Sequence, residues 1–479
     1  MYNEQQVFVE GLWVDVDGPG IDVEDPSTEQ SIGLVASSSL ADVERAVFAA
    51  RKAFDEGPWP RMHRLERRAA LLRVADALER RQSEMGERLV ADLGCPVSQV
   101  PGFQVSRSIN FWRIIAELAG TDDQLQPAMP TAHSMQPSLV AHEPIGVVGA
   151  ITAYNYPFMI ATWKIGPALA AGCTVVWKPN ETVPLIAYEV MRAVEEADLP
   201  PGVLNLVMGG PEVGEALVAN PGVDAVSFTG SVPTGEAVLR AAAGGIKKVV
   251  LELGGKSPAI VLDDADVDDL IPKVTYGYLL NTGQACAATT RLLVHQSLYD
   301  EVVEKVCVAT AAVPVGDPRN PKTVVGPLVS RRQLDRVNGY VQRVADEGGK
   351  LAVGGGRPPG LDVGHYIEPA VVVGLDNQAS VVRDEIFGPV LTVLPFGDDD
   401  EAIRIANDTP FGLAAVLFGK KPSRTHAIAR AIRAGTICIN SGTFNPLAPI
   451  GGYKQSGLGR ENGMWGLNEF RELKHISWA

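Results

Sequence analysis

Cys286 is the side chain of this 479-residue sequence best suited to act as a nucleophile. It lies in the stretch Asn281-Thr282-Gly283-Gln284-Ala285-Cys286-Ala287-Ala288, where an alanine on each side leaves the thiol uncrowded. A free cysteine has a pKa near ~8.5, so a small fraction is thiolate at neutral pH, and that fraction is a strong nucleophile. A cysteine outside a disulfide is also commonly a small buried hydrophobic residue. Both interpretations are open for Cys286 taken alone.

Two further side chains could assist the attack of a thiolate on a carbonyl group. The Asn155 amide could donate a hydrogen bond to a developing oxyanion, which is worth roughly 3 kcal/mol in a dry site, or it could merely cap the next helix. Glu252 precedes Gly254 and Gly255, so its carboxylate could swing, and partial burial would raise its pKa toward that of a general base. The alternative is that Glu252 only pairs with Lys256.

Other polar residues are suited to binding a nucleotide. Lys178 and Glu181 place a cation and a carboxylate three residues apart, and both can bond to ribose hydroxyls. The run Thr229-Gly230-Ser231 precedes Gly235, a G-x-x-x-x-G spacing that matches neither the dinucleotide fingerprint nor a P-loop, although amides at a helix start could bind one phosphate. The segment Glu385-Ile386-Phe387-Gly388-Pro389 reads most simply as a turn with a core phenylalanine.

The elements that must position these residues alternate between strands and helices along residues 144–254. Short apolar runs predict strands at 147–151, 174–177, 203–207, 225–228 and 248–251. Helical spacing predicts helices at 157–171, 182–197, 212–219 and 234–243. This alternation is typical of βαβ units in a parallel sheet, where ligands bind at the carboxyl ends of strands. The residues that follow each strand are therefore the candidates for binding.

The rest of the chain predicts a helical first part and a second α/β region. Before residue 145 we expect a hairpin over 7–16, a helix capped by Ser39 with Asp42 three residues on, and one long helix over about 61–92. From about residue 255 to 440, strands are expected at 259–262, 292–295, 366–373, 390–394, 414–418 and 437–439.

Composition limits the class of protein. A content of 46% hydrophobic and 21% charged residues is that of a soluble globular protein, and the length predicts two or three domains. The net charge of -15 argues against nucleic acid and anionic membranes as partners. Five cysteines without close spacing favour a reducing cytoplasm, and the scattered histidines indicate no metal site. Residues 145–163 are uncharged, but Asn155 and Pro157 favour a buried strand, loop and helix over a membrane span.

In their order along the chain, eight segments resemble the aldehyde dehydrogenase superfamily. They are Ala153-Tyr154-Asn155-Tyr156-Pro157, Trp163-Lys164-Ile165-Gly166-Pro167-Ala168-Leu169, Trp177-Lys178-Pro179, Phe228-Thr229-Gly230-Ser231, Leu251-Glu252-Leu253-Gly254-Gly255-Lys256, Gly283-Gln284-Ala285-Cys286, Glu385-Ile386-Phe387-Gly388-Pro389 and Gly451-Gly452-Tyr453-Lys454-Gln455-Ser456-Gly457. One departure is Ala153-Tyr154, where the family usually has Pro-Trp. It affects the floor of the pocket and leaves Asn155 in place.

The resemblance implies an α/β architecture with three parts. A Rossmann-like parallel-sheet domain, residues 1–124 and 145–254, would bind NAD. A second α/β domain, residues 255–445, would carry the nucleophile. Residues 125–144 and 468–479 would form a small oligomerisation hairpin, which implies a homo-oligomer, either a dimer or a tetramer.

The resemblance also implies a role for each candidate residue. Cys286 would be the nucleophile, Asn155 the oxyanion donor, and Glu252 the base that activates water. The residues implied to hold NAD are Lys178 and Glu181 at the adenosine ribose, Gly230 and Ser231 at the pyrophosphate, Glu385 at the nicotinamide ribose, and Thr229 and Phe387 near the nicotinamide. Glu181 favours NAD because its carboxylate would repel a 2′-phosphate.

The implied reaction is oxidation of an aldehyde to an acid through a thiohemiacetal and a thioester on the cysteine. The glutamate favours hydrolysis of the thioester over transfer to coenzyme A. The implied substrate pocket is mostly apolar and contains no Arg or Lys: Tyr156, Met159, Ile160, Trp163, Ala285, Ala287 and the 443–447 loop with Phe444. We therefore predict a medium-sized apolar aliphatic or aromatic aldehyde as substrate.

Two alternatives belong to other classes of protein. A dinucleotide-binding protein that has lost catalysis would lack the nucleophile or the base, yet Cys286, Asn155 and Glu252 are all present. A cysteine-dependent esterase or acyltransferase without redox chemistry would leave the ribose-binding residues unexplained. Dependence of product formation on NAD separates this second alternative from a dehydrogenase.

Overall fold

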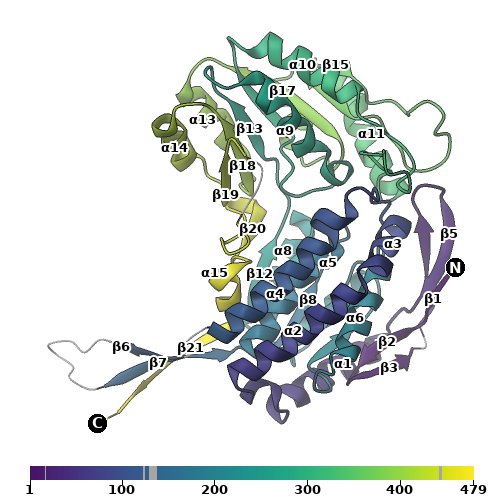
Figure 1. Cartoon of the computed structure of the whole chain (residues 1–479), viewed down its shortest axis with the longest axis vertical. Coiled ribbons are helices and arrows are strands. Elements are labelled where there is room, and N and C mark those ends of the chain that lie inside the picture. Colours follow the sequence, from purple (N-terminus) through teal and green to yellow (C-terminus); the bar gives the residue numbers. More distant parts are fainter. Residues whose placement is uncertain (17, 122–124, 129–136, 442–444, 479) are drawn as a thin grey trace.

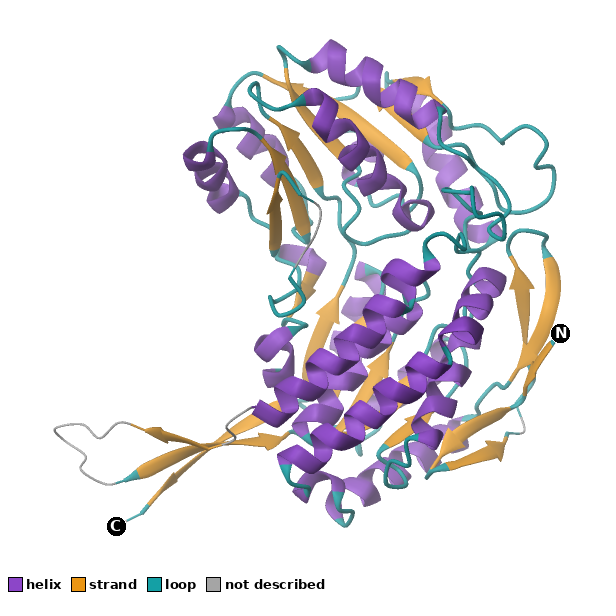
Figure 2. Ribbon diagram, in the orientation of Figure 1, coloured by secondary structure: helices purple, strands orange, loops and turns teal. Residues whose placement is uncertain are grey.

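The computed structural model of the chain describes residues 1–478 apart from residues 17, 122–124, 129–136 and 442–444. The described helices and strands form two lobes, and a narrow arm of strands projects from one of them (Figure 1). Each lobe contains strands flanked by helices (Figure 2). The fold is therefore α/β, as the sequence predicts.

The first lobe is built on a six-stranded sheet in the order β10-β9-β8-β11-β12-β20. Its strands are β8 (Val147–Ile151), β9 (Thr174–Lys178), β10 (Leu204–Leu206), β11 (Ala225–Thr229), β12 (Lys248–Glu252) and β20 (Gly457–Leu458). The first five are parallel and β20 is antiparallel to β12. The strand order reverses between β8 and β11, as in Rossmann-like sheets, and such switch points are where these sheets bind ligands.

Helices surround this sheet, directly or through other helices, and the last four of them lie in the crossovers between its parallel strands. They are α1 (Leu40–Asp55), α2 (Arg64–Arg80), α3 (Gln82–Asp92), α4 (Ser106–Thr121), α5 (Pro157–Ala171), α6 (Leu185–Glu196), α7 (Pro211–Ala219) and α8 (Val232–Ala243), with short turns η1 (Trp59–Arg61) and η2 (Val100–Gln104). Every residue of α5 is buried, since α4, α6 and the sheet surround it. Gly172 ends α5 at φ 101°, a conformation that favours glycine.

Two predictions concern the helices in the first part of the chain. The Ser39 cap is confirmed, because its side chain and that of Asp42 form a capping box at the start of α1. The single helix over 61–92 is wrong. Arg81 leaves helical geometry between α2 and α3, and its guanidinium bonds to Glu189 of α6 at 3.0 Å. A contact with a distant helix therefore accompanies the break, where no glycine or proline marks it.

The first 145 residues also contain more strand than expected. The hairpin β2 (Gln6–Val9) and β3 (Leu12–Asp15) is confirmed, with Glu10 and Gly11 in its turn. A three-stranded sheet, ordered β1-β5-β4, was not predicted: β1 (Tyr2–Glu4), β4 (Ile21–Asp25) and β5 (Gln30–Val35). An irregularity of register after Val23 interrupts its pairing, so the sequence alternation is weak there.

The second lobe is built on a seven-stranded sheet in the order β15-β16-β17-β14-β13-β18-β19, parallel except for β15. Its strands are β13 (Pro258–Val261), β14 (Arg291–His295), β15 (Lys350–Val353), β16 (Ala370–Val373), β17 (Val390–Phe396), β18 (Ala414–Phe418) and β19 (Thr436–Ile439). Its helices are α9 (Val267–Leu279), η3 (Leu280–Gly283), α10 (Tyr299–Ala311), α11 (Arg331–Asp346), α12 (Ser380–Arg383), α13 (Asp399–Asn407) and α14 (Pro422–Ala431). The strand expected over 366–373 begins only at Ala370, because Glu368 bonds instead to the loop at Gly356.

The arm is an antiparallel sheet in the order β21-β7-β6. It joins β6 (Leu125–Ala128) and β7 (Ser138–Pro144) to the C-terminal β21 (Arg471–Ser477), and η4 (Lys454–Ser456) and α15 (Gly463–Asn468) precede it in the chain. Leu473, Ile476 and Trp478 are exposed on it. Its role in oligomerisation stays a prediction, as do the domain boundaries, and β20 adds residues 457–458 to the first sheet.

The described helices include none that is both long and apolar enough to cross a membrane. The uncharged stretch 145–163 forms β8, a loop and the first turns of α5.

Candidate active site

The thiol of Cys286 lies on a tightly folded loop after α9. Asn281, Thr282 and Gly283 all have positive φ angles, and a Cβ on Gly283 would overlap the backbone of Gly388. Gln284 is buried and bonds through its side chain to the backbone of Asn281 and Val329. Cys286 itself is half-buried. The loop is thus held on several sides while the thiol keeps some exposure.

Asn155 is directed at this loop. Its Nδ2 donates to the carbonyl oxygen of Gln284 at 3.0 Å, and Asn281 Nδ2 donates to the Asn155 carbonyl at 2.8 Å. Tyr156, not Asn155, is the N-cap of α5 and makes no side-chain cap, so the helix-capping alternative is wrong. A primary amide has two N–H donors, and among the described residues only the Gln284 carbonyl accepts from the Asn155 amide. The second is available to another acceptor.

Glu252 ends β12 and is 7% exposed. No residue in the described part of the chain bonds to its Oε1, and a Cβ on Gly451 would lie 3.0 Å from that atom. Burial, and then the charge of Glu461, raise the pKa of Glu252 well above its usual value. Lys256 does not pair with it, since its Nζ donates to the carbonyl of Val381 at 2.9 Å. The alternative of a Glu252–Lys256 pair is therefore wrong.

A buried ion pair beside Glu252 was missed by sequence reasoning. Lys164 Nζ lies 2.7 Å from Glu461 Oε1, and both side chains are almost fully buried. Lys164 opposes the rise in the pKa of Glu252, while Glu461 adds to it. The signal in the sequence was a lysine within the apolar helix 157–171, because a buried lysine needs a partner.

Burial raises the pKa of the Cys286 thiol to about 12, and the Glu252 and Glu385 carboxylates act in the same direction. Cys286 in turn contributes to the raised pKa of Tyr156, after burial. These four side chains therefore share one electrostatic neighbourhood. In this state the thiol is neutral at physiological pH, so a proton acceptor is needed to form the thiolate.

Two glycines separate Glu385 from the Cys286 loop. The Glu385 Oε1 accepts from the Gly255 amide at 3.0 Å, and a Cβ on Gly254 would overlap the Glu385 carboxylate. A Cβ on Gly255 would lie 2.5 Å from the Cys286 carbonyl oxygen. No larger residue fits between these segments. Burial raises the pKa of Glu385 to about 7.

Phe387 is not part of a hydrophobic core. It is half-buried at φ 61°, in the left-handed region, and its ring meets Tyr154 edge to face at 5.9 Å between centroids. Tyr154 is the second residue of the Ala153-Tyr154 pair at which the chain departs from the family pattern. The departure therefore falls on the contact between the Asn155 loop and the Glu385 segment.

The residues predicted to bind the adenosine ribose and the pyrophosphate, together with Thr229, lie at the carboxyl ends of β9 and β11, the strands on either side of β8. Lys178 Nζ donates to Glu181 Oε2 at 3.0 Å. Thr229 Oγ1 is buried and has no partner among the described residues. Ser231 is the exposed N-cap of α8, and a Cβ on Gly230 would overlap the Phe228 ring. Pro233 has no N–H and the Thr234 amide donates to Ser231 Oγ, so the first turn of α8 offers chiefly the Val232 amide to an anion.

An apolar cluster lies next to Asn155 in the chain. Tyr156, Met159, Ile160 and Trp163 are each at most 8% exposed and pack with Phe111 of α4, whose ring meets Trp163 edge to face at 5.6 Å. Ala153, Leu280, Ala285 and Ile450 border the cluster. Phe111 and Ile450 were missed because their segments were not among those that resemble the family. Thr443 and Phe444 lie outside the described residues.

Comparison with known proteins settles which family has this arrangement. The profile of the aldehyde dehydrogenase family matches residues 13–476. The chain belongs to the aldehyde dehydrogenase family. A betaine aldehyde dehydrogenase of Bacillus subtilis (strain 168) is 38% identical over 479 residues, covering 98% of this chain and 97% of the relative. The mitochondrial benzaldehyde dehydrogenase of Antirrhinum majus is 40% identical over 478 residues, covering 99% and 89%.

A solved structure gives the same result. A mutant of aldehyde dehydrogenase C from Pseudomonas syringae, in complex with NAD+ and octanal, matches with a TM-score of 0.95 at 39% identity, covering 98% of this chain and 96% of that one. The present chain is therefore an NAD-dependent aldehyde dehydrogenase. Its own residues fit the cofactor. The Thr229 hydroxyl, which has no partner among the described residues, the start of α8 and the Lys178–Glu181 pair offer groups for a dinucleotide at the carboxyl ends of the strands.

Proposed function

We propose that this aldehyde dehydrogenase oxidises a medium-sized apolar aldehyde to its carboxylic acid through a thioester on Cys286. The observation that carries the proposal is the 3.0 Å hydrogen bond from Asn155 Nδ2 to the Gln284 carbonyl. That bond fixes an amide donor beside the loop of a half-buried thiol whose pKa responds to Glu252.

The first step is attack of the Cys286 sulfur on the aldehyde carbon. Because the pKa of the thiol is raised to about 12, the half-buried sulfur must lose its proton, which passes to solvent water as the sulfur attacks. The new carbon–sulfur bond places a negative charge on the former carbonyl oxygen. The second N–H of Asn155 and the backbone amide of Cys286 would stabilise that charge.

NAD+ would be held by residues of both lobes. Lys178 and Glu181 would bind the adenosine ribose, Gly230 and Ser231 the pyrophosphate, and Glu385 the nicotinamide ribose, with Thr229 and Phe387 beside the nicotinamide. When bound, NAD+ supplies the acceptor for the hydride that leaves the substrate carbon, which turns the adduct on Cys286 into a thioester.

Glu252 would then release the acid. Its raised pKa suits a group that takes a proton from water near neutral pH, so that the resulting hydroxide adds to the thioester carbon. Collapse of that adduct breaks the carbon–sulfur bond, returns the Cys286 thiolate and frees the carboxylate. The adjacent Lys164–Glu461 pair sets the charge around this base.

The substrate class follows from the apolar cluster around Trp163. Its members carry no charged side chain, so a carboxylate or ammonium on the substrate would lose hydration without gaining an ionic partner. The similar protein from Pseudomonas syringae was solved with octanal, which supports an apolar substrate. Sequence identity alone does not distinguish a charged from an apolar substrate, because the betaine aldehyde and benzaldehyde relatives are about equally similar to this chain.

We also propose that the β6–β7–β21 arm pairs copies of the chain into a dimer or tetramer and that the enzyme acts in the cytoplasm. The exposed Leu473, Ile476 and Trp478 support pairing through the arm. The five free cysteines support a reducing cytoplasm.

The test is NADH absorbance over a panel of aldehydes with the native enzyme and the Cys286→Ala variant. We expect hexanal and benzaldehyde to be preferred and the variant to form no NADH. A higher kcat/KM for succinic semialdehyde than for both would overturn the substrate class. Acid formation by the native enzyme without NAD would instead favour an esterase or acyltransferase.

A further inference from the structure

A buried arginine in the second lobe joins segments that carry the site residues. Arg291 lies five residues after Cys286 at the start of β14 and is 1% exposed. Its Nε donates to the Lys256 carbonyl at 3.0 Å, and its Nη groups donate to the carbonyls of Ile405 at 3.2 Å and Ala406 at 3.0 Å. Arg291 therefore closes the end of α13 and holds the segment that follows Glu252.

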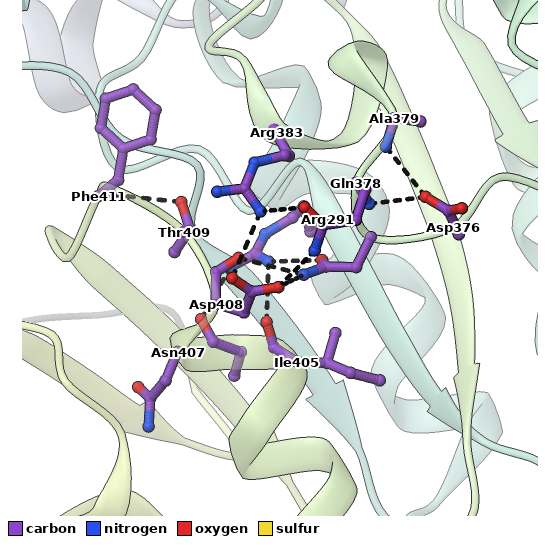
Figure 3. A network of polar contacts seen from close by, with 12 residues as sticks. Arg291, Asp376, Gln378, Ala379, Arg383, Ile405, Asn407, Asp408, Thr409 and Phe411 are labelled. Atoms are coloured by element: carbon purple, nitrogen blue, oxygen red, sulfur yellow. Dashed lines mark hydrogen bonds and ion pairs between the residues drawn. The ribbon is translucent and has the colours of Figure 1, made fainter.

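Asp408 lies at the same end of α13 and accepts from three donors (Figure 3). The donors are Asn377 Nδ2 at 2.9 Å, Gln378 Nε2 at 2.8 Å and Arg383 Nη1 at 3.4 Å. Burial opposes ionisation of this carboxyl, but these three bonds outweigh it and lower its pKa. Asn377 also accepts from Arg291 at 3.2 Å through its Oδ1, so the two groups form one network.

The network closes into a ring around α12. Lys256 is 1% exposed, and its Nζ donates to the Val381 carbonyl at 2.9 Å. From Asp408 the hydrogen bonds pass to Asn377 and then to Arg291, which donates to the Lys256 carbonyl. The Lys256 amine bonds to Val381 of α12, and Arg383 of the same helix bonds to Asp408, which completes the ring. Glu385 follows Arg383 by two residues, and its carboxylate accepts from Gly255, the neighbour of Lys256.

A further segment reaches the same turn. Lys454 Nζ donates to the carbonyls of Asn407 at 2.8 Å and Thr409 at 3.0 Å. Lys454 follows Gly451, the residue whose backbone lies beside the Glu252 carboxylate. The turn after α13 is thus a meeting point for the segments next to Cys286, Glu252 and Glu385.

We propose that Asp408 is a positioning residue that fixes Glu385 for the cofactor by holding Arg383 and Asn377. The inference rests on the proposed function, which assigns Glu385 to the nicotinamide ribose. The Asp408 side chain is 41% exposed, so its replacement should leave the fold intact, whereas removal of the buried Arg291 would leave buried carbonyls unpaired and destabilise the fold.

The experiment uses Asp408→Asn, which keeps the size of the side chain and removes the charge that holds Arg383. We expect the Kd for NAD+ to rise about threefold to tenfold, the range that follows from losing one net hydrogen bond of order 1 kcal/mol. The rate at which iodoacetamide alkylates Cys286 in the absence of NAD+ should stay within about twofold, because burial and Glu252 act on the pKa of the thiol more strongly than Glu385 does. Arg383→Gln removes the other half of the pair and should reproduce the result.

Glu401→Gln is the matched control. Glu401 lies in the first turn of the same helix, pairs with Arg404 at 3.0 Å, and is also 41% exposed. It takes no part in the ring, so its Kd for NAD+ should match that of the native enzyme. An equal change in the Kd for NAD+ in the Asp408→Asn and Glu401→Gln variants would overturn the inference.

A double-mutant cycle with Glu385→Gln shows through which residue Asp408 acts. If it acts through Glu385, the effect of Asp408→Asn should disappear in the Glu385→Gln background. An effect of undiminished size in that background would overturn the inference and leave the proposed function intact. If Glu385→Gln alone leaves the Kd for NAD+ unchanged, the role assigned to Glu385 in the proposed function fails, and the inference fails with it.

Discussion

Replacement of Asn155 by alanine tests whether its amide stabilises an oxyanion. Within the described part of the chain, its side chain makes one hydrogen bond, from Nδ2 to the Gln284 carbonyl. The bonds from Gln104 and Asn281 reach the backbone carbonyl of Asn155 and survive the change. The loss of stability should therefore be about 1 kcal/mol. Loss of an oxyanion donor costs about 3–4 kcal/mol, so kcat should fall by about 10²–10³. Steady-state NADH formation from hexanal measures this fall in kcat.

The pattern of the kinetic change distinguishes an oxyanion donor from a group that only binds substrate. An interaction made only as the oxyanion forms should lower kcat and kcat/KM equally and leave KM for the aldehyde near its native value. Asn155→Asp, which keeps the shape and offers no amide donor when ionised, should be as slow as alanine. A kcat within about threefold of native for Asn155→Ala would refute the assignment, because loss of an oxyanion donor should lower kcat far more than that.

Two further predictions concern the thiol and the cofactor. Because the pKa of Cys286 is raised to about 12, its thiolate fraction in the enzyme without NAD+ should rise about tenfold per pH unit, and the alkylation rate should climb without a plateau from pH ~6 to ~9; a plateau in that window would contradict the raised pKa. Glu181→Ser should lower KM for NADP+ by about tenfold, because one carboxylate opposite a 2′-phosphate is removed while Lys178 remains; an unchanged ratio of kcat/KM for NAD+ and NADP+ would place the ribose elsewhere.

The first sheet was predictable because its strands are buried on both faces. Val147–Ile151 and Thr174–Lys178 have no exposed residue, so each appears in the sequence as a continuous apolar run between glycine, proline and helical spacing. β20 was not predictable. It has two residues and joins Glu252 from about 200 residues away, so no local pattern marks it.

Helix breaks and polar networks depend on contacts across the chain. Arg81 ends α2 where the periodicity continues, and it bonds to Glu189 of another helix. Lys256 looked like a partner of Glu252 because it is close in sequence, yet its amine bonds to Val381. Spacing along the chain shows neither partner, because both are set by packing between distant elements.

The polar residues of the candidate site could be named from the sequence because they follow strands or glycine turns, and their roles stay predictions. Asn155 and Glu252 could be named as candidates for binding or catalysis because they lie at strand ends, whereas their individual roles were inferred from the family resemblance. Phe111 and Asp408 could not be singled out. Phe111 is one apolar residue among many in α4, and Asp408 gains meaning only through the three donors that converge on it.

In the proposed mechanism a thioester forms on Cys286, and Glu252 drives its hydrolysis. The most direct measurement is mass spectrometry of the Glu252→Gln variant mixed with NAD+ and hexanal. We predict rapid formation of one NADH per subunit, followed by a stop, and a hexanoyl group on the peptide that contains Cys286. Continuous turnover at the native rate, or NADH formation with no acyl group on that peptide, would contradict the mechanism.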